Sequence, residues 1–192
     1  MRRRSVIPQR RRIFLGCEGE SERSYATFLG QFLREHHRLH IALAPEVLRP
    51  GGGDPLALVQ LAVRRIARNE RNHGPYELKA VLLDSDKVGA DLARDRSMHN
   101  LAADQQIRLI FQQPAHEGFL LRHLSGCQQQ RPPTATIALA ALRHEWPNYR
   151  KPMSSRDIAE RVGDAGVRQA CEVETDLREF LMELGLEWRD NR

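Results

Sequence analysis

The chain has 192 residues, the size of one domain, and 41% hydrophobic residues, enough to form a core, so general disorder is excluded. The formal net charge of +5 is local: taking away the six arginines among the first twelve residues leaves −1 for the rest of the chain. The three cysteines lack the spacing of a disulfide framework or a zinc site, which favours a cytoplasmic protein. No apolar run approaches the ~20 residues of a membrane span, so we expect no membrane contact.

Hydrophobic periodicity predicts alternating strands and helices over the first 125 residues. The predicted strands cover 12–17, 39–48, 76–83 and 107–111, and the predicted helices cover 21–37, 54–72, 88–103 and 115–124. Pro45 favours an edge position or a bulge for the second strand. The third strand ends in four apolar residues, which is typical of a central parallel strand.

A polar, proline-containing joint at 128–133 separates this part from helices predicted at 134–145, 154–162 and 167–184. The alternation predicts the α/β fold class, with a mostly parallel sheet flanked by helices and a helical C-terminal extension. The predicted organisation is a basic N-terminal arm at 1–12, an α/β core at 13–127 and the helical extension at 128–192.

Acidic residues follow three of the predicted strands. They are Glu18, Glu20 and Glu22 after the first strand, Asp84 and Asp86 after the third, and Glu117 beyond the fourth. The carboxyl ends of parallel strands lie at one edge of a sheet, where open α/β folds bind ligands. Oxygen ligands without histidine or cysteine favour Mg²⁺ or Mn²⁺, which commonly serve phosphoryl chemistry. Two plainer readings stay open, because Glu20 and Glu22 also suit the first turn of a helix and Asp-x-Asp also suits a turn.

Three segments carry a resemblance to a known family. Ile13-Phe-Leu-Gly-Cys-Glu-Gly-Glu-Ser-Glu22 with Tyr25, Val81-Leu-Leu-Asp-Ser-Asp-Lys87 and Gln113-Pro-Ala-His-Glu-Gly-Phe-Leu-Leu-Arg-His123 resemble, in this order, motifs of RloB-like proteins. These proteins carry a Toprim domain, a Rossmann-like metal-dependent fold, and are associated with bacterial restriction and anti-phage defence loci. The chain departs from the family pattern at Ser21, Gln113, His116 and Gly118-Phe119, and none of these changes removes a carboxylate.

The resemblance implies a nuclease that hydrolyses DNA or RNA with Mg²⁺ or Mn²⁺. Glu18 would act as general acid/base or metal ligand, Asp84 and Asp86 as the metal-binding pair, and Glu117 as a supporting ligand. Lys87 would hold the scissile phosphate. Pro147-Asn-Tyr-Arg-Lys151 is similar to a further element of the family, and it adds Lys151 as a nucleic-acid contact.

Other residues are secondary candidates. His116 and His123 are possible substrate contacts, as Glu20 and Glu22 are possible further ligands. We expect the N-terminal arginines to bind phosphates without reading sequence; they are Arg2, Arg3, Arg4, Arg10, Arg11 and Arg12. Two alternatives remain open: a catalytically silent nucleic-acid-binding or scaffold subunit of a defence complex, and a haloacid-dehalogenase-type phosphatase with Asp84 as nucleophile.

Overall fold

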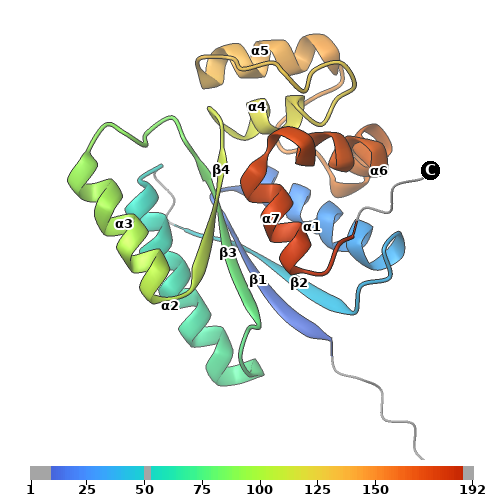
Figure 1. Cartoon of the computed structure of the whole chain (residues 1–192). Coiled ribbons are helices and arrows are strands. Elements are labelled where there is room, and N and C mark those ends of the chain that lie inside the picture. Colours follow the sequence, from blue (N-terminus) through green and yellow to red (C-terminus); the bar gives the residue numbers. More distant parts are fainter. Residues whose placement is uncertain (1–9, 50–52, 188–192) are drawn as a thin grey trace, which may run out of the picture.

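The structure is a computed structural model that describes residues 10–49 and 53–187. Its centre is a four-stranded, all-parallel sheet with the order β2-β1-β3-β4 (Figure 1). The strands are β1 (Arg11–Cys17), β2 (Ile41–Val47), β3 (Leu78–Asp84) and β4 (Ile107–Gln112). Helices cover both faces of the sheet, so the prediction of an α/β fold with a parallel sheet is confirmed.

The two central strands are the most apolar ones, because both of their faces are covered. The run from Ile13 to Cys17 in β1 and the run from Ala80 to Leu83 in β3 are buried. β2 lies at an edge of the sheet, where the missing N–H of Pro45 interrupts no ladder on its outer side. The edge position predicted from Pro45 is therefore confirmed.

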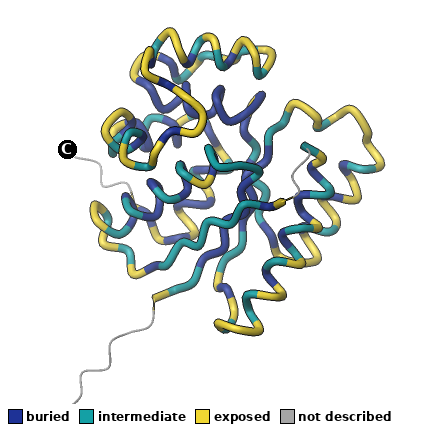
Figure 2. The backbone as a smooth tube through the Cα atoms, turned by 180° about the vertical axis from the view of Figure 1, so that it is seen from behind, coloured by how far each residue is buried: buried dark blue, intermediate teal, exposed yellow. Residues whose placement is uncertain are grey.

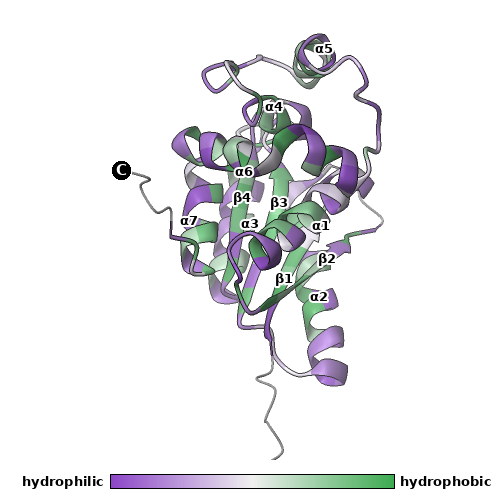
Figure 3. Ribbon diagram, turned by 90° about the vertical axis from the view of Figure 1, so that its right-hand side faces the viewer, coloured by the Kyte–Doolittle hydropathy of each residue, from purple (hydrophilic) through white to green (hydrophobic). Residues whose placement is uncertain are grey.

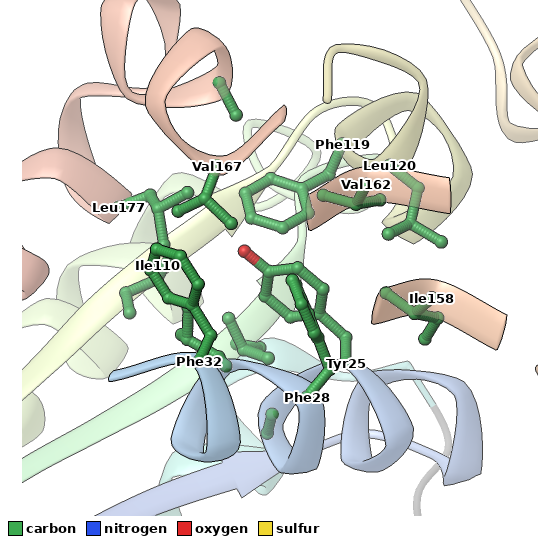
Figure 4. Close-up of a cluster of buried hydrophobic side chains, with 14 of the residues drawn as sticks. Tyr25, Phe28, Phe32, Ile110, Phe119, Leu120, Ile158, Val162, Val167 and Leu177 are labelled. Carbon is green, nitrogen blue, oxygen red and sulfur yellow. The ribbon is translucent and has the colours of Figure 1, made fainter. Parts of the chain in front are cut away.

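One face of the sheet is covered by the first helix and the last two. These are α1 (Glu20–Glu35), α6 (Ser155–Val173) and α7 (Thr175–Glu183). Figure 4 shows Tyr25 and Phe28 rising from α1 towards Phe119 and Val167, with the rings of Tyr25 and Phe119 5.2 Å apart. Residues near the two ends of the sequence therefore build one core.

The other face is covered by α2 (Pro55–His73) and α3 (Leu92–Asp104), which pack against each other. Each begins at an aspartate that caps the helix: Asp54 accepts bonds from the amides of Leu56 and Ala57, and Asp91 does the same for the amides of its own first turn. The sheet between the two helical layers is largely buried, whereas the outward sides of the helices are exposed (Figure 2).

The short helix α4 (His116–Leu121) and the helix α5 (Ala135–Glu145) lie beyond the carboxyl ends of the strands, at the top of Figure 1. All six residues of α4 are buried, and the helix packs against α5. Figure 3 shows the same contrast in hydropathy, with apolar strands inside and polar helix surfaces outside. Among the described residues, no helix combines the length and the apolar character that crossing a bilayer requires.

The prediction of one helix over 167–184 is wrong. α6 ends at Val173 and α7 begins at Thr175, because Glu174 between them leaves the helical conformation and its carboxylate pairs with the buried guanidinium of Arg122. The predicted break near 163 is present as a kink, since Gly163 has a φ of 58° inside α6.

Candidate functional site

Carboxylates from four segments gather at the carboxyl edge of the sheet. Glu18 follows β1, Glu22 lies in the first turn of α1, Asp84 ends β3 and Glu117 lies at the start of α4. These three glutamates, together with Asp86, all act on Asp84 electrostatically and raise its pKa. The structure thus brings together the acidic residues that the sequence places after separate strands.

Asp84 is the most perturbed of these groups. Burial, and then the negative charges of Glu22, Glu18, Glu117 and Asp86, raise its pKa from 3.8 to about 8. Its Oδ1 atom is buried and has no hydrogen-bond partner within the described part of the chain. A cation arriving at the site would relieve the repulsion that raises this pKa.

Glu18 is partly buried beside the same cluster. Burial and the charge of Glu22 raise its pKa above the ordinary value, while Lys87 and Lys151 act in the opposite direction. A carboxylate with a raised pKa is a better proton acceptor at neutral pH than an ordinary glutamate. This environment suits the acid/base role predicted for Glu18.

The structure separates Glu20 from Glu22. The carboxylate of Glu20 pairs with Arg23 and Arg49, at 2.6 Å in each case, away from the cluster. Glu22 is only 7% exposed, and its Oε2 accepts the amide N–H of Gly19 at 3.1 Å, so it caps α1 and also faces Asp84. Both residues lie in the first turn of α1, and of the two it is Glu22 that acts on Asp84.

Glu117 is held by two donors from the loop between α5 and α6. The Tyr149 hydroxyl donates to Glu117 Oε1 at 3.1 Å, and Lys151 Nζ lies 2.5 Å from the same oxygen. Glu117 is 2% exposed, whereas the Lys151 side chain is 53% exposed. Sequence reasoning missed Tyr149; its place two residues before Lys151 in the Pro147–Lys151 motif was the available signal.

Lys87 lies in the loop after β3, close to Glu18. A methyl group built at Gly53 would lie 2.0 Å from Lys87 Nζ and 3.4 Å from Glu18 Oε1, and Gly53 has a φ of 63°. The backbone at Gly53 therefore approaches the site closely, and its positive φ favours glycine. The role of Gly53 was not predicted.

The two predicted histidines differ in what their ring nitrogens contact. His116 Nδ1 lies 2.9 Å from the side-chain amide nitrogen of Gln112, and its buried Nε2 has no partner among the described residues. His123 bonds to the Tyr25 hydroxyl and to the Phe119 carbonyl, and burial lowers its pKa to about 4. Both nitrogens of His123 are thus used within the core.

The cluster fits a hard divalent cation in the type of its ligands and in charge. The orphaned Oδ1 of Asp84 and the mutual repulsion that raises its pKa are what a cation would relieve. Across residues 10–49 and 53–187, however, no three His, Cys, Asp or Glu side chains converge closely enough to hold a metal ion. Cation binding therefore requires side-chain movement at this edge.

The predicted basic arm is partly wrong. Arg11 and Arg12 belong to β1: Arg11 pairs with Glu77 at 2.6 Å, and Arg12 donates to the carbonyls of His73 and Gly74 and covers the ring of Tyr76. They lie at the start of the strand, at the edge opposite the carboxylates. Arg10 is exposed, and Arg2, Arg3 and Arg4 lie outside the described residues.

Comparison with known proteins adds no relative: no protein-family model, curated protein or solved structure matches this chain.

Proposed function

We propose that the protein is a divalent-cation-dependent nuclease of the Toprim type, which hydrolyses phosphodiester bonds of DNA or RNA. The observation that carries the proposal is the gathering of Glu18, Glu22, Asp84 and Glu117 at the carboxyl edge of a parallel sheet. The sequence resemblance to RloB-like proteins supports the same activity, and with it a place in bacterial anti-phage defence.

The residues have separate tasks in this proposal. Asp84 and Asp86 would hold Mg²⁺ or Mn²⁺, which would stabilise negative charge that develops on the phosphate oxygens. Glu18, whose pKa burial raises, accepts the proton of the attacking water. Lys87, beside Glu18, neutralises a non-bridging phosphate oxygen. Glu117 is the supporting carboxylate of the site.

The test is cleavage of single-stranded DNA, duplex DNA and transfer RNA by the purified full chain, with Mg²⁺, with Mn²⁺ and with EDTA. We expect cation-dependent cleavage, and we expect Asp84→Ala to lower the rate by at least roughly 100-fold, because it removes the central carboxylate of the site. Glu20→Gln is the matched control: it changes an acidic residue of the same segment that pairs outward with Arg23 and Arg49, and cleavage should persist.

The same experiment separates the alternatives that the sequence left open. A silent binding or scaffold subunit retains nucleic acid but cleaves none of the substrates under any cation. A haloacid-dehalogenase-type phosphatase hydrolyses a phosphomonoester such as p-nitrophenyl phosphate and leaves the nucleic acids intact. Either result overturns the proposed nuclease.

A further inference from the structure

The outward face of α2 exposes three arginines and no acidic side chain. Arg64, Arg68 and Arg71 follow one another at spacings of four and three residues, so they lie on one face of the helix, and all three are exposed. Within residues 10–49 and 53–187, none of the three has a hydrogen-bond or ion-pair partner. These residues are referred to below as the arginine stripe.

The neighbouring charges of α2 are engaged elsewhere. Arg65 pairs with Glu46 at 3.4 Å, and the carboxylate of Glu70 accepts the amide N–H of Tyr76 at 2.9 Å. A helix on the other face of the sheet shows the more common arrangement, since α6 has three arginines among four acidic residues. The arginine stripe is therefore a surface of one sign that no carboxylate of the helix neutralises.

The arginine stripe lies on a helix that starts at the acidic site. Gly53, which approaches Lys87 and Glu18, comes just before α2, and the far end of the helix is bonded to Arg12 at the amino edge of the sheet (Figure 1). With a rise of about 1.5 Å per residue, the stripe extends from about 14 to about 24 Å along the axis from the first residue of α2. It thus points away from the site along the length of the sheet.

The spacing and the chemistry of the arginine stripe fit a nucleic-acid backbone. The stripe is about 10 Å long, and one strand of a duplex presents about three phosphates over that length of its axis. Unpaired guanidinium groups bind phosphate oxygens well. A membrane surface fits less well, because α2 exposes no aliphatic side chain larger than alanine that could enter the lipid.

We propose that the arginine stripe of α2 binds the phosphate backbone of the nucleic-acid substrate, up to about seven nucleotides from the bond that the acidic site cleaves. This inference rests on the proposed function and adds a substrate-binding surface to it. The stripe contacts phosphates only, so it binds without reading sequence.

The first experiment measures binding of a fluorescein-labelled duplex of about 20 base pairs to the full chain, in EDTA, at salt concentrations from about 50 to 200 mM. We expect Arg68→Gln to lower the slope of log affinity against log salt by about 0.9. We expect the triple variant Arg64→Gln/Arg68→Gln/Arg71→Gln to lower the affinity by roughly 10- to 100-fold. Arg65→Gln is the matched control: it removes the same charge from the same helix at a residue that is paired with Glu46, so its slope should stay near that of the wild type. Glutamine keeps the helix propensity of arginine, and circular dichroism checks the fold of each variant.

The second experiment measures cleavage of the same duplex with Mn²⁺. We expect the KM of Arg68→Gln to rise several-fold and the KM of Arg65→Gln to stay at the wild-type value. This result would connect the bound backbone with the acidic site.

Four results would overturn the inference, and they are distinguishable from one another. Equal salt slopes for Arg68→Gln and Arg65→Gln would remove the binding surface and leave the nuclease proposal intact. A weaker duplex affinity of Arg68→Gln with an unchanged KM would show that the backbone on the stripe is not the substrate. Loss of binding to phosphatidylglycerol vesicles, with duplex binding unchanged, would make the stripe a membrane contact. No cleavage of any nucleic acid by the wild type would overturn the proposed function, and with it the link between the stripe and that site.

Discussion

At the scale of single residues, Asp84 shows how a fold can hold a carboxylate in an unfavourable place. An aspartate in an unfolded chain titrates near 4, whereas burial and four nearby carboxylates raise the pKa of Asp84 to about 8. The folded protein consequently binds the Asp84 proton more tightly than the unfolded chain does. The stability that this provides is complete below about pH 4 and is lost as the pH rises through 8.

Asp84→Asn should therefore stabilise the metal-free protein at alkaline pH. In EDTA, we expect the free energies of unfolding of wild type and variant to agree near pH 4 and to differ by roughly 2–5 kcal/mol at pH 8.5, in favour of the variant. Urea denaturation at pH 4, 6 and 8.5 measures the difference. If the free energies of unfolding of wild type and variant differed by the same amount at all three pH values, Asp84 would ionise in the folded protein as easily as in the unfolded chain. That result would contradict the buried, acidic environment described above.

At the scale of elements, the position of α4 depends on a close backbone approach. A methyl group at Gly118 would lie 2.5 Å from the carbonyl oxygen of Gln113 and 2.8 Å from the ring of Pro114. Glycine thus lets the helix begin directly against the turn that follows β4. Because His116 and Glu117 form the first turn of α4, the same approach sets where their side chains lie.

Gly118→Ala should displace α4 and lower the free energy of unfolding by roughly 1–3 kcal/mol, as overpacked substitutions do. It should also reduce the cleavage rate, since Glu117 moves with the helix. Gly30→Ala in α1 is the matched control, because its nearest neighbour is a side chain at 3.2 Å and alanine favours the helix. Thermal and urea denaturation measure the loss in free energy of unfolding for each variant. An equal or larger loss for Gly30→Ala than for Gly118→Ala would contradict the tight contact at Gly118.

The elements themselves were largely predictable, and the reasons are local. Apolar runs marked the strands, Asp54 and Pro55 marked the start of α2, and the alternation of strands and helices indicated parallel connections that bring the carboxyl ends to one edge. What was missed depends on distant partners. Arg12 bonds to carbonyls over sixty residues away, the break at Glu174 depends on Arg122, and Tyr149 reaches Glu117 across 32 residues. The place of Tyr149 in the Pro147–Lys151 motif was a signal for its contact, but no spacing in the sequence encodes the partners of Arg12 and Glu174.

At the scale of the whole molecule, the acidic cluster and the two arginines of β1 lie at opposite ends of the sheet. The carboxylates lie at the carboxyl edge, and Arg11 and Arg12 lie at the start of β1. A seven-residue strand spans about 20 Å, which is beyond the screening length at physiological salt. We therefore expect these two arginines to stabilise the fold rather than to steer a substrate to the acidic edge.

Arg12→Ala should lower the free energy of unfolding and leave nucleic-acid binding unchanged. Deletion of residues 2–9 should weaken nucleic-acid binding and leave the free energy of unfolding unchanged. The substitution removes two bonds to carbonyls and the contact over the Tyr76 ring, worth roughly 1–3 kcal/mol in urea denaturation. The deletion removes Arg2, Arg3 and Arg4, so the slope of log affinity against log salt for duplex DNA should fall by up to about 3. If Arg12→Ala instead weakened nucleic-acid binding and left the free energy of unfolding unchanged, Arg12 would act as part of the basic N-terminal arm.

The covering of one sheet face by α6 and α7 has a consequence for how the protein is made. Synthesis proceeds from the N-terminus, so β1, β3 and β4 are complete before residues 155–183 exist. Until those residues emerge, part of the apolar surface formed by α1 and the sheet has no cover, and the guanidinium of Arg122 has no carboxylate. The nascent chain therefore cannot complete this core until residues 155–183 have left the ribosome, and until then it exposes apolar surface that the folded protein covers.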